Sequence, residues 1–184
     1  MKKTLRKSTN TVPELLKDVF FVIICLIIIL LIRRFVIEKF EISERSMENT
    51  LFDKDIVLAE KVSGFFSDYE RFDVIIFTKS QGTGSKTYVK RVIGLPGEKV
   101  LIADSKIYIN GEVLSEDYGS GEMGSAGIAS VTRELGENEY FVLGDNREVS
   151  IDSRSSVVGT VKKNEIEGKV IIRLWPFSRF GRIN

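Results

Sequence analysis

Ser46 and Lys90 are the residues of this chain that could together perform hydrolysis. The 184-residue sequence contains no histidine, so a serine nucleophile has no imidazole to accept its proton. A lysine, a carboxylate or a tyrosine must then be the general base. Ser46 lies in the stretch RSMENTL (45–51) and is the candidate nucleophile. A free lysine has a pKa of about 10.4, so a lysine base must be buried where apolar surroundings disfavour its charge.

Lys90 is the candidate base because it lies in a predicted β-strand with bulky neighbours, TYVKRVIGLPG (87–97). Alternation along a strand puts Lys90 on the face of Tyr88 and Val92, and Arg91 on the opposite face. The pattern leaves two possibilities open, a buried lysine or a surface lysine whose amine reaches water, since most lysines are exposed.

A third polar stretch, GDNREVSIDSR (144–154), directly follows the apolar segment 140–143. Two interpretations are open for it. It is either a solvated turn with ion pairs or a scaffold that orients catalytic side chains by hydrogen bonds. Its charged residues of interest are Asp145, Arg147, Asp152 and Arg154.

The N-terminal region predicts a membrane anchor over residues 19–37. Residues 19–32 (VFFVIICLIIILLI) are apolar without interruption, and neighbouring residues can extend them to the roughly 20 needed for a span. Basic residues before the run predict that segment 1–18 is cytoplasmic, with a single span and the remainder of the chain outside the cell membrane. These residues are Lys2, Lys3, Arg6, Lys7 and Lys17. A cleaved signal, for which no small-x-small site follows, and a buried soluble helix are the alternatives.

Composition argues against several classes of partner and cofactor. Lys and Arg number 27 against 26 Asp and Glu, and no basic stripe is present, so we expect no nucleic-acid partner. The single cysteine, Cys25, excludes a disulfide within the chain and a thiolate metal site. Without histidine, zinc would need carboxylates alone, which is unusual. We expect no metal and no organic cofactor.

From Phe40 onward the sequence is typical of a β-rich domain, with short alternating segments separated by Gly, Asn, Asp and Ser. The predicted strands are Lys39–Ile42, Ile56–Val62, Asp73–Phe77, Thr87–Ile93, Lys99–Ala103, Lys106–Ile109, Glu112–Leu114, Tyr140–Leu143 and Lys169–Leu174. Asn110-Gly111 predicts a type I′ hairpin, and residues 81–85 and 119–127 predict flexible loops. The expected fold is mainly β: a catalytic domain (38–99 and 136–184) interrupted by an inserted lobe (100–135).

Four stretches together resemble the motif boxes of bacterial type I signal peptidases of the Gram-positive type. They are RSMENTL, RFDVIIF (71–77), YVKRVIGLPGE (88–98) and GDNREVSIDSR, in this order and behind the predicted anchor. The resemblance implies a membrane-bound serine endopeptidase that removes N-terminal signal peptides through an acyl-enzyme. Its implied partners are membrane lipid and exported preproteins with small residues at positions −3 and −1. An anchor would raise the effective concentration of substrate at the membrane surface.

The resemblance also implies roles for individual residues. Ser46 would attack the peptide carbonyl, and neutral Lys90 would accept its proton and pass it to the leaving amine. Ser150 would hydrogen-bond and orient Lys90, and Met47 would line the substrate groove. Two ion pairs would hold the shape of the site, Asp152 with Arg154 and Asp145 with Arg91.

Two residues near Ser46 depart from the family pattern. Asn49 stands where proline is usual, and it lacks the fixed φ of proline, so we expect a less rigid turn. Glu44 replaces a glycine or serine beside the oxyanion hole, and alternation puts it on the Ser46 face if the strand extends that far. A carboxylate there would repel the oxyanion. Either Glu44 turns away to pair with a cation such as Arg45, or the activity is reduced or specialised.

These departures keep a second function open, a signal-peptidase-like assembly factor that binds pilin subunits without cutting them. Intact Ser46 and Lys90 favour the enzyme. The related fold of self-cleaving repressors is disfavoured because an anchor, and no DNA-binding segment, precedes the β-rich region.

Overall fold

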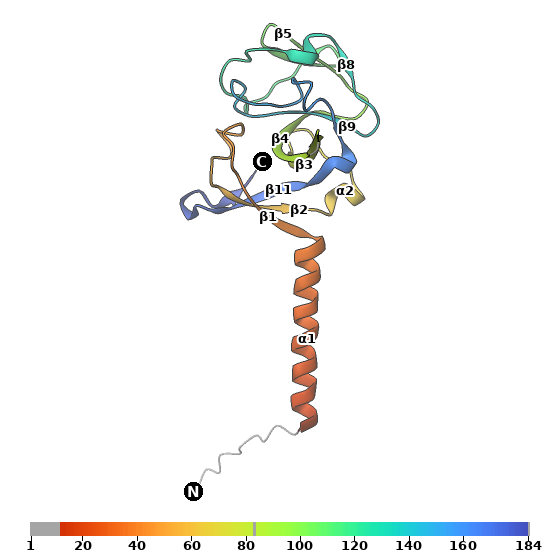
Figure 1. Ribbon diagram of the computed structural model, residues 1–184, viewed down its shortest axis with the longest axis vertical. Helices are drawn as coiled ribbons and strands as arrows, with labels where there is room; N and C mark the ends of the chain where they lie inside the picture. The colour runs from red at the N-terminus through yellow and green to blue at the C-terminus, as the bar shows by residue number, and fades with distance from the viewer. Residues whose placement is uncertain (1–11, 83, 184) are drawn as a thin grey trace. The chain divides into compact units, whose positions relative to one another are not determined.

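The computed structural model describes residues 12–82 and 84–183 and has two compact units that divide after Val36 (Figure 1). The first unit contains helix α1, Val12–Phe35. Residues 14–35 are long and apolar enough to cross a membrane, a property that a signal sequence shares. The bounds of the helix differ from those of the predicted anchor, 19–37. The helix begins at Val12, before residue 19, and Ile37 already lies in a strand. Of the basic residues that predict orientation, Lys2, Lys3, Arg6 and Lys7 lie outside the described residues.

The second unit is built on a large antiparallel sheet, which confirms the mainly β fold (Figure 1). Its strand order is β1-β2-β11-β3-β4-β9-β10, with β12 paired to β11. The strands are β1 (Ile37–Glu41), β2 (Ile56–Glu60), β3 (Val74–Gln81), β4 (Gly84–Gly94), β9 (Glu139–Leu143), β10 (Val161–Lys162), β11 (Ile166–Trp175) and β12 (Gly181–Arg182). A short helix, α2 (Ser63–Phe66), follows β2. The sheet places β4, which carries Lys90, between β3 and β9.

A smaller sheet occupies the chain between β4 and β9 and has the order β7-β6-β5-β8. Its strands are β5 (Lys99–Ala103), β6 (Lys106–Ile109), β7 (Glu112–Val113) and β8 (Arg133–Glu134). Asn110 and Gly111 both have positive φ, 55° and 88°, which confirms the predicted type I′ turn between β6 and β7. The small sheet covers nearly the same residues as the predicted lobe.

The hairpin that joins β3 to β4 contradicts the predicted loop at residues 81–85. Gln81 pairs with Gly84, so the strands extend into the predicted loop, and Thr83 lies outside the described residues. The φ of Gly82, 57°, permits the tight turn. Strands β8, β10 and β12 were not predicted, because two residues are too few to show alternation.

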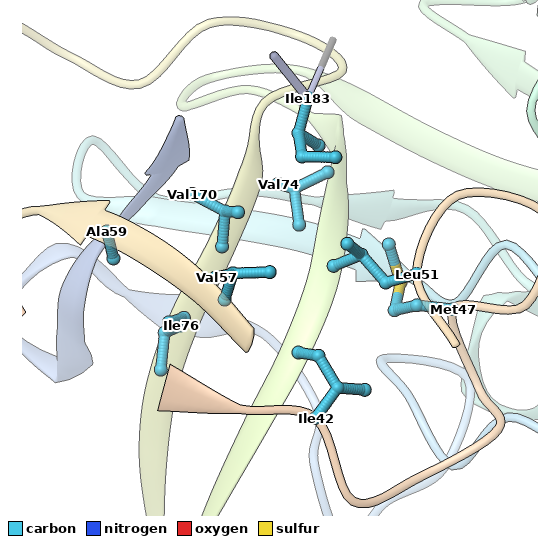
Figure 2. Close-up of a cluster of buried hydrophobic side chains, with 9 residues drawn as sticks. All are labelled: Ile42, Met47, Leu51, Val57, Ala59, Val74, Ile76, Val170 and Ile183. Atoms are coloured by element: carbon cyan, nitrogen blue, oxygen red, sulfur yellow. The ribbon is translucent and has the colours of Figure 1, made fainter. Parts of the chain in front are cut away.

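One cluster of buried side chains packs against the face of β2, β3 and β11 (Figure 2). Its members are Ile42, Met47, Leu51, Val57, Ala59, Val74, Ile76, Val170 and Ile183. Three of them, Ile42, Met47 and Leu51, come from the segment on either side of Ser46. Burial of these side chains stabilises that segment against the sheet, at roughly 1.5–3 kcal/mol for each fully buried large side chain.

Candidate active site

Ser46 lies in a turn between β1 and β2. The turn is closed by backbone hydrogen bonds from Glu48 N–H to Arg45 O (3.1 Å) and from Leu51 N–H to Met47 O (2.8 Å). Met47, the predicted groove residue, is 1% exposed and is held with Leu51 in the cluster of Figure 2. Because β1 ends at Glu41, the strand alternation used to orient residue 44 does not reach it.

Asn49 adopts a backbone conformation that proline cannot adopt. Its φ is 101°, whereas the proline ring holds φ near −65°. Asparagine tolerates positive φ better than most residues. The turn beside Ser46 therefore has a backbone that suits asparagine at position 49.

Lys90 is fully buried on β4, which answers the question left open by its sequence pattern. Its Nζ lies 2.7 Å from Ser46 Oγ and also donates a hydrogen bond to Val89 O (3.0 Å). The Tyr88 ring centroid lies 5.5 Å from Nζ, as expected for residues on one face of a strand. Burial lowers the pKa of Lys90 to about 8, against opposing carboxylates of which Glu44 is the strongest. The amine can therefore be neutral near neutral pH.

Gly144, at the end of β9, lets the chain approach Ser46 closely. Asn146 N–H donates a hydrogen bond to Ser46 O (3.1 Å). A Cβ atom on Gly144 would clash with Ser46 O and with the Ser150 side chain. The glycine of the GDN sequence is thus required by the close packing of two segments about a hundred residues apart.

Asp145 and Arg91 form a buried bidentate ion pair. Arg91 Nε and Nη2 donate to the two carboxylate oxygens over 2.9 and 2.8 Å, and neither side chain is exposed. Thr50 Oγ1 donates to the same carboxylate over 2.5 Å, and the guanidinium stacks 3.6 Å from the Tyr118 ring centroid. Since Arg91 adjoins Lys90 and Thr50 ends the Ser46 turn, the pair fixes the strand and the turn relative to each other.

Asp152 and Arg154 form a second buried ion pair, with distances of 2.8 and 2.9 Å. Asp152 also accepts a hydrogen bond from Gly144 N–H (3.1 Å), and Arg154 donates to Arg147 O (2.8 Å). Arg147 in turn pairs with Glu116 from the segment that follows the small sheet's β7. The stretch 144–154 is therefore a buried ionic scaffold, not a solvated turn.

Ser150 does not make the hydrogen bond to Lys90 that was predicted. Its Oγ is buried and has no hydrogen-bond partner in the described part of the chain. The hydroxyl lies against Gly144, while the Lys90 amine donates to Ser46 Oγ and Val89 O. The contact of Ser150 with the site is therefore its packing against Gly144, which in turn lies against Ser46.

Glu44 pairs with a cation, as one of the two alternatives required, but the cation is Lys86 and not the suggested Arg45. Glu44 Oε1 lies 2.7 Å from Lys86 Nζ, and Oε2 lies 3.9 Å from Lys90 Nζ. Arg45 is paired with Glu48 instead, at 2.7 Å. Sequence reasoning missed Lys86, although alternation along β4 puts it on the Lys90 face, because nothing local indicates which acid it meets.

Two cavities meet at Ser46. One, of about 180 Å³, is lined by the apolar side chains of Phe40, Ile42, Met47 and Val89 together with polar and acidic residues that include Glu41, Glu44 and Thr87. The other, of about 300 Å³, is lined by residues 43–46, Val149 and Ile151. A larger cavity of about 620 Å³ is lined by other residues and reaches neither Ser46 nor Lys90.

The backbone N–H of Ser46 has no hydrogen-bond partner within residues 12–82 and 84–183. A free N–H beside a nucleophile can donate to the oxyanion that forms when a carbonyl is attacked. The arrangement therefore has the elements of acyl transfer: a hydroxyl nucleophile, a buried amine that can be neutral, a free donor and adjoining cavities.

Comparisons with known proteins agree with this chemistry. Residues 14–175 match the family model described as signal peptidase, peptidase S26. The chain is similar to signal peptidase I of Bacillus licheniformis, with 35% identity over 95% of this chain and 96% of the relative. It is also similar to signal peptidase I T of Bacillus subtilis (strain 168), with 36% identity over 96% and 92% of the two chains.

A third relative is signal peptidase IB of Staphylococcus aureus, with 31% identity over 91% of this chain and 93% of the relative. Among solved structures, the chain matches a signal peptidase I from Enterococcus faecalis V583 at 36% identity. That match covers 56% of this chain and 97% of the other, with a TM-score of 0.43.

Proposed function

Since the chain belongs to the signal peptidase family, peptidase S26, we propose that Ser46 and Lys90 are the nucleophile and general base of its activity. The chain is a serine endopeptidase that removes signal peptides from exported proteins. The observation that carries the assignment of residues is the 2.7 Å approach of the buried Lys90 Nζ to Ser46 Oγ. The non-cutting pilus assembly factor is not favoured, because the relatives named here are signal peptidases.

The proposed reaction begins with the neutral form of Lys90. As Ser46 Oγ attacks the carbonyl at the cleavage site, its proton passes to Lys90 Nζ and the carbonyl oxygen becomes an oxyanion. The Glu44 carboxylate cannot donate a hydrogen bond to that oxyanion, whereas the Ser46 N–H, unpaired among the described residues, can. Collapse breaks the peptide bond, and the ammonium of Lys90 gives the proton to the leaving amine. A water molecule, activated by neutral Lys90, then hydrolyses the acyl-enzyme.

The buried ion pairs support this chemistry by position. Arg91 with Asp145 holds the strand that carries Lys90, and Asp152 with Arg154 holds the segment that packs on Ser46 through Gly144. Rigid support of this kind keeps a nucleophile and base within hydrogen-bond reach. Ser150 becomes an orienting residue only if its buried hydroxyl turns toward Lys90 when substrate binds.

The cavity of about 180 Å³ beside Ser46 is proposed to hold the small residues at positions −3 and −1 of the signal peptide. The apolar part of its lining suits alanine-sized side chains, and the limited volume excludes large ones. Met47 contributes to this lining while being fixed in the core, so the floor of the groove is rigid.

We further propose that α1 contains an uncleaved anchor from residue 19 onward, with segment 1–18 cytoplasmic and the catalytic domain outside the membrane. The apolar stretch 14–35 and the pair Arg33 and Arg34 at the helix end support a span, since their stems can reach the interface. The catalytic domain is assigned to 38–99 and 136–184, and the inserted lobe to 100–135. Membrane lipid is then a partner of the anchor.

The test is cleavage of a preprotein with an Ala-x-Ala signal in detergent–lipid micelles. We expect Ser46→Ala and Lys90→Ala each to lower kcat/KM by at least about a hundredfold, because each removes a reacting group. Ser67→Ala and Lys106→Ala, which change exposed residues outside the site, are the matched controls and should cleave like the wild type. Substantial cleavage by either site variant would contradict the assignment.

A further inference from the structure

Glu44 lies between two lysines of one strand face. One carboxylate oxygen pairs with Lys86 at 2.7 Å, and the other lies 3.9 Å from Lys90 Nζ. Both lysines also lie near the Tyr88 ring, at 5.0 and 5.5 Å from its centroid. Glu44 and Lys86 are 38% and 43% exposed, so this pair can rearrange, whereas Lys90 is fully buried.

We propose that Lys86 is a positioning residue for the Ser46–Lys90 pair. It holds the Glu44 carboxylate 3.9 Å from Lys90 Nζ and thereby prevents a direct ion pair that would keep Lys90 charged. This role rests on the proposed function of Lys90 as the base. It gives this chain a way to tolerate a carboxylate at position 44, where the family pattern has a small residue.

The charges around Lys90 show why Glu44 is the decisive group. Four charged residues act on the Lys90 amine: Glu44, Asp152, Lys86 and Asp145. Asp145 is tied to Arg91 and Asp152 to Arg154 in buried bidentate pairs, so neither carboxylate is free to move toward Lys90. Glu44 alone is held by a partially exposed lysine. The position of its carboxylate therefore depends on Lys86.

The distances predict how Lys90 responds when Lys86 is removed. At 3.9 Å the Glu44 carboxylate is too far for a hydrogen bond to Nζ, but it is within ion-pair range. Without Lys86 it can approach to about 2.8 Å, and the cation that opposes protonation of Lys90 is lost as well. Both changes stabilise the ammonium, so we expect the pKa of Lys90 to rise by about one unit or more.

The experiment is the pH dependence of kcat/KM for full-length Lys86→Gln in detergent–lipid micelles with an Ala-x-Ala preprotein. We expect the ascending limb to move about one pH unit higher, so that cleavage at pH 7 falls about tenfold. Cleavage above the shifted pKa should match the wild type. Lys86→Arg keeps the cation and should restore the wild-type limb.

Two further variants separate positioning from a general charge effect. Glu44→Gln combined with Lys86→Gln should abolish the alkaline shift, because no carboxylate remains to approach Lys90 and the loss of the Glu44 charge offsets the loss of the Lys86 cation. Lys163→Gln breaks a 2.7 Å lysine–carboxylate pair with Asp68 elsewhere on the domain and should leave the limb unchanged.

An unchanged limb in Lys86→Gln, or an equal alkaline shift in the double variant, would overturn the proposal while leaving the catalytic pair intact. Failure of the catalytic pair itself would show differently, as full cleavage by Lys90→Ala. A loss of cleavage that is equal at every pH would also overturn it, since that result indicates lost substrate binding and not a displaced titration.

Discussion

Replacing Asp145 by Asn tests whether the buried scaffold supports the fold as well as the site. The substitution keeps the shape of the side chain but removes the charge that faces Arg91, whose guanidinium is fully buried. An arginine cannot lose its proton in a protein, so its charge would remain without a counter-ion. Breaking a buried pair by changing one partner typically costs about 3–5 kcal/mol.

We take about 3 kcal/mol as the expected loss, because Arg91 keeps its hydrogen bond to Phe72 O (2.8 Å) and its stacking on Tyr118. For a domain of this size, each kcal/mol lowers Tm by about 2–4 °C, so Tm should fall by about 6–12 °C. Thermal unfolding of the full chain, followed by near-UV circular dichroism in detergent, measures the shift.

The matched control is Asp68→Asn, which breaks a surface ion pair with Lys163 at 2.7 Å, compared with 2.8 Å for the buried pair. An exposed pair contributes little, so its Tm should stay within about 2 °C of the wild type. If Asp145→Asn unfolds within 2 °C of the wild type, or if the two variants shift equally, the argument from burial is refuted.

Three other predictions concern the site itself. With Lys90 as the base, kcat/KM should rise with pH through about 8, because burial lowers the pKa of the amine and only its neutral form accepts the proton. A flat profile of kcat/KM from pH 6 to 9 would contradict the assignment of Lys90 as the base. Gly144→Ala should destabilise the chain by about 1–3 kcal/mol, measured by urea unfolding, and should lower preprotein cleavage at least tenfold. Gly124→Ala, where an added Cβ meets open space, should change neither stability nor cleavage. Asn49→Pro should lower Tm and cleavage because φ is 101° there, while Asn49→Gly should retain both; equal behaviour of the two variants would contradict the observed turn.

Local patterns in the sequence were sufficient for much of the fold. Strands β5 and β6 were predicted with their observed bounds, since alternation over four or five residues between turn residues is a local signal. The Asn110-Gly111 hairpin follows from the preference of these residues for positive φ. The absence of histidine reduced the choice of base, and the face shared by Tyr88 and Lys90 follows from strand geometry.

The properties that suit Lys90 to act as a base come only from tertiary structure. Its burial depends on the packing of β4 in the sheet and of the Ser46 turn against it, and no local pattern reports how deeply a lysine is covered. The partner of Glu44 could not be predicted either, because Lys86 and Arg45 are both cations and only the folded chain decides which lies within reach. Side-chain periodicity is a property of one segment, whereas burial and ion pairing are set by segments that are distant in sequence and meet only when the chain folds.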